Sequence, residues 1–109
     1  MKISDEIKAQ LPPWNSLEGI EDARKMAQVK LTDLGLRTLY LLEAQYSKES
    51  GWAYLGVLHS RLPGRGPFDA WEFGVWSESD IEDARPEFRL DPYFTPTLLG
   101  GLTFHFWEK

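Results

Sequence analysis

The sequence contains no cysteine among its 109 residues. Disulfide bonds, thiol nucleophiles and thiolate metal ligands are therefore excluded. Histidine is scarce too, with His59 and His105 as the two in the chain. These histidines match none of the HxH, HExxH or HxxxH spacings typical of metal sites, so we expect no metal site.

Long apolar runs and an excess of basic residues are also missing. The longest apolar run, Leu39 to Leu42, has four residues, whereas a membrane-spanning helix needs about 20. The first ten residues, MKISDEIKAQ, have acids where a signal peptide needs an apolar core. We therefore expect a cytoplasmic protein that does not contact a membrane.

The net charge of −5 and the isoelectric point of about 5.0 bear on the kind of partner. Binding to a phosphate backbone requires a basic surface, so the charge argues against nucleic acid. A basic protein would suit this surface better.

The stretch HSRLPGRGPFDAWEFGVW, residues 59–76, raises the question of a phosphate-binding loop. A Walker loop needs a Lys and a hydroxyl after its second Gly, but Gly66 is followed by Pro67 and Phe68. Strand-like patterns lie on both sides, so the stretch is better explained as a hairpin connector. We expect no bound cofactor.

The N-terminal half predicts helices. Residues 3–10 favour a short helix, which the two prolines at 12 and 13 would end. Residues 15–35 predict the main helix, with a polar cap at Asn15 or Ser16 and a stop at Gly35. Its apolar residues recur at steps of three or four over part of its length: Leu17, Ile20, Ala27, Leu31 and Leu34.

The C-terminal half predicts strands, because 12 of the 15 aromatic residues follow residue 50. Residues 36–46 mix helix and strand formers, and the flanking turns favour a buried strand. Residues 79–88 predict a short helical turn capped by Ser79 or Asp80. Further strands are predicted over 52–61, 68–77, 87–91 and 102–108. We therefore expect one α+β domain over residues 1–109, with one main N-terminal helix packed on an antiparallel sheet of about four strands.

The predicted hairpin has a definite register if residues 62–67 form its loop. Symmetric pairing then places Leu58 opposite Trp71, Gly56 opposite Phe73 and Tyr54 opposite Val75. His59, Glu72 and Trp76 would share the other face, with His59 diagonal to Glu72.

Two groups of candidate site residues follow. A carboxylate beside an imidazole can orient it as a base or ligand group, so a small-molecule pocket on the sheet face would use His59, Glu72, Trp76, His105 and Trp107. The second group forms an acidic patch that would dock a basic partner; it comprises Glu78, Asp80, Glu82 and Asp83.

We expect a non-enzymatic protein-interaction module, of inhibitor or immunity type, rather than an enzyme. No nucleophile motif, metal motif or cofactor loop is visible. The alternative is a small-molecule-binding protein with an aromatic pocket, or a small enzyme that uses His59 and Glu72. Five tryptophans exceed what one core requires, so Trp76 and Trp107 need a cover. A ligand, a second subunit or a folded-back LPPW segment (residues 11–14) would supply it, and we favour a homodimer.

Overall fold

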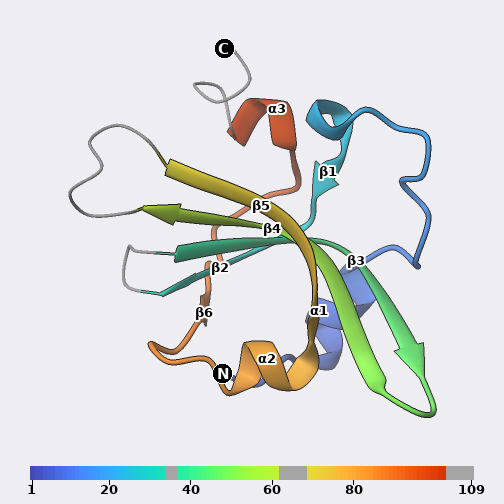
Figure 1. The fold of residues 1–109 in the computed structure, drawn as a ribbon, viewed down its shortest axis with the longest axis vertical. Helices are drawn as coiled ribbons and strands as arrows, with labels where there is room; N and C mark the ends of the chain where they lie inside the picture. The colour runs from blue at the N-terminus through green and yellow to red at the C-terminus, as the bar shows by residue number, and fades with distance from the viewer. Residues whose placement is uncertain (34–36, 62–68, 103–109) are drawn as a thin grey trace.

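The computed structural model describes residues 1–33, 37–61 and 69–102. A curved antiparallel sheet crosses the molecule, and short helices lie on both of its faces (Figure 1). The elements in chain order are α1 (Asp5–Gln10), η1 (Asp22–Arg24), β1 (Met26–Ala27), β2 (Val29–Asp33), β3 (Arg37–Ser47), β4 (Gly51–Arg61), β5 (Asp69–Ser77), α2 (Glu78–Glu82), β6 (Arg89–Leu90), β7 (Thr97–Leu98) and α3 (Leu99–Leu102).

The main sheet has five strands in the order β5-β4-β3-β2-β6, and every neighbouring pair is antiparallel. Strands β1 and β7 form a separate two-stranded sheet. In Figure 1, α1 and α2 lie on one side of the main sheet, while η1, β1 and α3 lie on the other. We call the side covered by α1 and α2 the helix face, and the other side the far face.

The predicted main helix over residues 15–35 is wrong. Up to residue 33 the chain there forms η1 and strands β1 and β2, and residues 34 and 35 lie outside the described residues. In β2, Val29, Leu31 and Asp33 are buried and alternate with half-buried residues, which is the period of two expected for a strand. Strand pairing with β3 and β6 outweighs the weak three-to-four spacing of the apolar residues.

Two backbone conformations also interrupt a helix between residues 15 and 20. Asn15 has φ of 67° and Gly19 has φ of 84°, a left-handed conformation that a right-handed helix excludes. The fold class is corrected accordingly: the chain is mostly sheet, and its longest described helix, α1, has six residues. None of the helices in the described ranges is long and apolar enough to cross a membrane.

Most of the other predicted elements are confirmed. Strands β3, β4 and β5 confirm the predictions over 36–46, 52–61 and 68–77, and α1 confirms the short helix over 3–10. Helix α2 is confirmed with a different cap, since Ser77 rather than Ser79 or Asp80 begins it. The strand predicted over 87–91 is shortened to β6. Leu102 ends α3, and the rest of the strand predicted over 102–108 lies outside the described residues.

The β4–β5 hairpin is confirmed, but its predicted register is wrong by one residue. Leu58 lies opposite Glu72, Gly56 opposite Gly74 and Tyr54 opposite Trp76. The connector spans residues 62–68 rather than 62–67. Because side chains alternate along a strand, one additional connector residue moves every β5 side chain to the other face.

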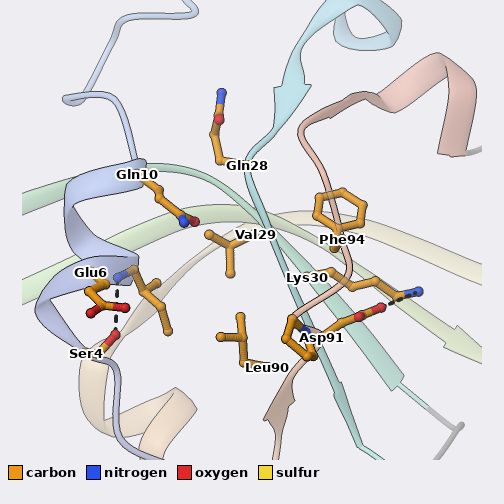
Figure 2. Close-up of a pocket in the computed structure, with 11 residues that line it drawn as sticks. Ser4, Glu6, Gln10, Gln28, Val29, Lys30, Leu90, Asp91 and Phe94 are labelled. Atoms are coloured by element: carbon orange, nitrogen blue, oxygen red, sulfur yellow. Dashed lines mark hydrogen bonds and ion pairs between the residues drawn. The ribbon is translucent and has the colours of Figure 1, made fainter.

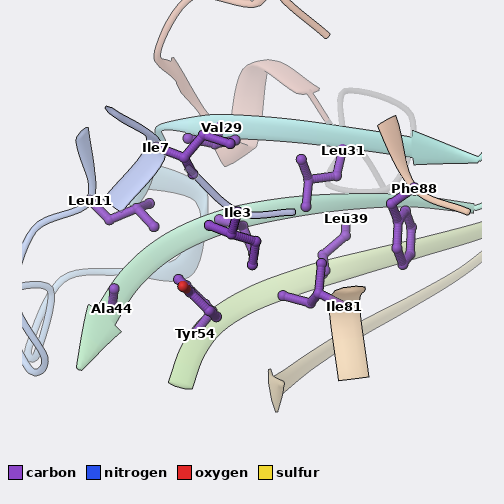
Figure 3. Close-up of a cluster of buried hydrophobic side chains, with 11 residues drawn as sticks. Ile3, Ile7, Leu11, Val29, Leu31, Leu39, Ala44, Tyr54, Ile81 and Phe88 are labelled. Carbon is purple, nitrogen blue, oxygen red and sulfur yellow. The ribbon is translucent and has the colours of Figure 1, made fainter. Parts of the chain in front are cut away.

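The helix face carries the larger core. Ile3, Ile7 and Leu11, from α1 and the chain beside it, and Ile81 of α2 pack on the buried residues of β2, β3 and β4 (Figure 3). Trp52 and Trp76 are half-buried at the margin of this core. The far face has its own smaller core around Ala27, Tyr40, Leu42, Val57 and Leu99. The sheet is therefore covered on both faces, as a sheet with apolar residues on both sides requires.

Candidate functional site

An open aromatic hollow of about 440 Å³ lies where the β3–β4 hairpin turns. Its aromatic lining comes from Trp14, Tyr46 and Trp52. Tyr46 and Trp52 are direct cross-strand partners with ring centroids 5.5 Å apart, and Tyr46 is 59% exposed. Hollows of about 300–1,000 Å³ are large enough for a ligand or a few partner side chains.

A second open hollow, of about 280 Å³, adjoins the first at Trp52, which lines both. Its acidic lining comes from Glu78, Glu82 and Asp83 at α2. Hydroxyl groups complete the polar surface, from Ser50, Ser77 and Ser79. We call the two hollows together the hairpin groove; it has aromatic surface at one end and carboxylates at the other.

Lys8 of α1 links the two ends of the hairpin groove. Its Nζ lies 3.0 Å from Oε1 of Glu78 and 5.1 Å from the ring centroid of Trp52. The Lys8 side chain is only 17% exposed. An ammonium over an indole face and beside a carboxylate is stabilised by both groups, so the groove already holds a cation from its own chain.

Tyr54 holds Glu78 in place through a hydrogen bond. Its side chain is fully buried, its ring stacks on Trp52 at 6.4 Å, and its hydroxyl donates to Oε1 of Glu78 at 2.8 Å. Burial, and then the hydrogen bond to Glu78, raise the pKa of the Tyr54 hydroxyl well above its usual range. Tyr54 therefore remains a hydrogen-bond donor at neutral pH.

Trp14 lines the groove because the chain after α1 lies parallel to the end of β3. The amide of Ala44 donates to the carbonyl of Pro12 at 3.0 Å, and Pro13 forms a parallel bridge with Ala44. The prolines end α1, as the sequence predicts, and favour the extended backbone that follows. The LPPW segment therefore lies against the end of β3.

Glu43 holds the next part of that segment. Its two carboxylate oxygens accept the backbone N–H groups of Leu17, at 2.8 Å, and Asn15, at 3.3 Å. Glu43 is 2% exposed and lies beside the bulge at Leu42 in β3. A buried carboxylate is stabilised when backbone donors satisfy it, so we assign Glu43 the role of a positioning residue for the segment that carries Trp14.

Three of the four acids predicted to bind a partner also stabilise the fold. Asp80 completes a capping box with Ser77, in which each side chain accepts the other's backbone N–H at 3.0 Å. Oε2 of Glu82 accepts the backbone N–H of Ile3 at 2.9 Å, and Glu78 binds Lys8 and Tyr54. Asp83 is exposed beside them. The acidic patch is thus tied into the fold by contacts of three of its members, and it lies next to Trp52.

The expected grouping of His59 with Glu72 and Trp76 on one face is wrong. His59 lies opposite Trp71 on the far face and stacks on its indole with centroids 4.0 Å apart. Glu72 and Trp76 lie on the helix face, opposite Leu58 and Tyr54. His105 and Trp107 lie outside the described residues. Ligand binding by any one of these residues stays a prediction.

A smaller pocket of about 100 Å³ lies between α1, β2 and the segment after β6 (Figure 2). Polar side chains surround it, among them Glu6, Gln10, Gln28 and the ion pair of Lys30 with Asp91. Its volume is well below the roughly 300 Å³ at which ligand pockets begin, so water-sized contents fit it best. Among the residues that the structure describes, no group of three or more His, Asp or Glu is placed to hold a metal ion.

Comparison with protein-family models, with curated proteins and with solved structures gives no match. The assignment of a site therefore rests on the geometry of the hairpin groove. Sequence reasoning found its acids and noted the LPPW segment, but it missed Lys8, Tyr46 and Trp52 as members. It also missed the supporting role of Glu43, for which the available signal was an acid within an apolar strand, LYLLEA.

Proposed function

We propose that this protein is a non-enzymatic protein-interaction module that binds a basic segment of a partner in the hairpin groove. The observation that carries the proposal is the position of Lys8, an ammonium held between the indole of Trp52 and the carboxylate of Glu78. A lysine or arginine of a partner would find the same two kinds of group beside it, since Tyr46 and Asp83 are exposed.

The charge of the whole chain supports a basic partner. A net charge of −5 attracts a cationic surface over several ångströms and speeds its association. Aromatic rings at the same place add apolar contact, and side chains of this type dominate binding energy at interfaces. The groove thus combines electrostatic attraction with a site for close packing.

The proposal is tested by selecting peptides from a random displayed library on the intact protein. Selected peptides should be rich in Lys and Arg, and their affinity should fall as salt rises. Tyr46→Ser should weaken peptide binding by about tenfold or less, and Trp52→Leu should weaken it by about tenfold or more. Cation–π and aromatic contacts each contribute about 0.5–2 kcal/mol to such binding.

Tyr93→Ser provides the matched control, since Tyr93 is 91% exposed and lies outside the groove. It should leave the affinity unchanged. Peptides without basic residues, or basic peptides that bind the Tyr46 and Trp52 variants as well as the wild type, would overturn the proposal.

A further inference from the structure

Strand β5 forms one edge of the main sheet. Its nine residues pair with β4 on one side through an uninterrupted register. Within the described ranges no strand pairs with its other side. Proteins usually protect such an edge with charged side chains, Pro or a bulge. Strand β5, DAWEFGVWS, has an exposed charge at Glu72, and the ammonium of Lys25 lies 5.5 Å from the ring centroid of Phe73, but the strand contains neither Lys nor Pro. The edge is therefore a template for a further strand.

The side chains along this edge include two exposed apolar groups. Phe73 is 43% exposed and Val75 is 57% exposed. Both lie on the far face, because they are the cross-strand partners of Val57 and Leu55. An apolar pair beside an unpaired backbone edge indicates a strand partner that brings apolar side chains of its own.

We infer that a second copy of this chain pairs its β5 antiparallel to this β5 around a two-fold axis at Gly74. Phe73 then lies opposite Val75 of the partner subunit, and Val75 lies opposite Phe73 of the partner subunit. The two sheets become one continuous sheet, and four exposed apolar side chains form one cluster. A two-fold interface requires such a self-complementary surface.

The register follows from the residues that it brings together. Aromatic side chains opposite β-branched ones are favourable cross-strand pairs. Glu72 lies opposite Trp76 of the partner subunit, and the two Glu72 carboxylates stay apart along the strands. A register centred on Phe73 would instead place these two carboxylates diagonally beside each other, which like charges disfavour.

Gly74 suits the central position. A Cβ built there would approach the ring of the chain's own Trp76 to 3.0 Å, so this ring already lies over the glycine on the helix face. Two glycines facing each other allow the two strands to pair without a side-chain collision. The second subunit thus supplies a neighbour for Trp76, which was expected because the sequence has more tryptophans than one core requires.

Sedimentation equilibrium of the full chain over a dilution series tests the inference. The wild type should dimerise, and Val75→Glu should weaken dimerisation by about tenfold or more, because it places charges opposite Phe73 and diagonal to each other. Tyr93→Glu adds the same charge at a 91% exposed residue outside β5 and should leave the dimer intact. Circular dichroism confirms that both variants fold.

A monomeric wild type would overturn the inference. So would a dimer that persists in Val75→Glu, or one that is weakened equally by Tyr93→Glu.

The register has its own test, because the chain has no cysteine. Phe73→Cys mixed with Val75→Cys should form a mixed disulfide on oxidation, since directly opposite Cα atoms lie about 4.5–5.5 Å apart. Either variant alone should crosslink poorly, because diagonal positions are about 7–8 Å apart, at or beyond the limit for a disulfide. Equal crosslinking in all three samples would contradict the register.

Discussion

Lys8 and Glu78 join the N-terminal helix to the helix after β5, with Nζ 3.0 Å from Oε1. The pair lies beside Trp52, where the aromatic and acidic parts of the hairpin groove meet. Lys8 therefore joins two parts of the fold and, under the proposed function, lies beside the groups that a partner's basic side chain would contact.

Removing Lys8 should strengthen binding of a basic peptide to the groove. Lys8→Met keeps the apolar stem, leaves Glu78 with one partner fewer and vacates the face of Trp52, so we expect affinity to rise about threefold to tenfold. Titration calorimetry with a peptide from the selection measures this. Lys2→Met removes the same charge at an exposed residue and should have a smaller effect. A fall in affinity for Lys8→Met would contradict the expectation.

Glu43 should be critical for stability because its buried carboxylate accepts two backbone N–H groups. Glu43→Leu removes the protein acceptor of both N–H groups and should lower the free energy of unfolding by about 1–3 kcal/mol, whereas Glu43→Gln retains one acceptor and should lose less. Urea unfolding measures both. Glu49→Gln, at an exposed acid of the β3–β4 turn, should stay within about 0.5 kcal/mol of the wild type. A stable Glu43→Leu would show that the segment is held by other contacts.

Tyr54 should make the protein less stable at alkaline pH. Its pKa in the folded state is raised above the ordinary value of about 10, so its contribution is complete below that value and is lost as pH rises towards the folded pKa. Tyr40, whose pKa burial also raises, adds to the same trend. Urea unfolding above pH 10 should show a smaller decline for Tyr54→Phe than for the wild type. Equal slopes for the wild type and Tyr54→Phe would contradict the assignment.

Substitution by alanine should lower the stability of the fold at Gly56 but not at Gly101. A Cβ at Gly56 would come within 2.6 Å of the carbonyl oxygen of Tyr40, a backbone atom that cannot move aside. Gly56→Ala should therefore destabilise the fold by about 1–3 kcal/mol. At Gly101 in α3 the nearest side-chain atom is 3.5 Å away, so alanine should be neutral or stabilise by up to about 1 kcal/mol. Thermal unfolding distinguishes them, and a neutral Gly56→Ala would be inconsistent with the close β3–β4 approach.

Local patterns in the sequence were enough to predict β3, β4, β5 and both short helices α1 and α2. Alternation of apolar residues and turn residues are signals that depend on a few neighbouring residues, and these elements follow such signals. Residues 26–33 also alternate, as MAQVKLTD shows, but scattered apolar residues upstream favoured a helix. What decides the structure there is the pairing of β2 with β3 and β6, which the local sequence does not display.

The register and the groove could not be predicted in the same way. The register depends on one residue in the length of the connector, and no local pattern measures that length. The groove combines Lys8, Trp14, Trp52 and Glu78, which come from four separate parts of the chain. Trp14 is placed there by two tertiary contacts, of Pro13 with Ala44 and of Leu17 with Glu43, and Lys8 by its contacts with Glu78 and Trp52. The acids at 78–83 were predicted as a group because they are neighbours in sequence.

Binding in the hairpin groove is tested most directly by an NMR titration of the full chain with a selected basic peptide, following the indole N–H signals. The signals of Trp14 and Trp52 should shift with the peptide, while that of Trp71, on the far face, should stay in place. Shifts confined to Trp71, or no indole shift at saturating peptide, would contradict binding in the hairpin groove.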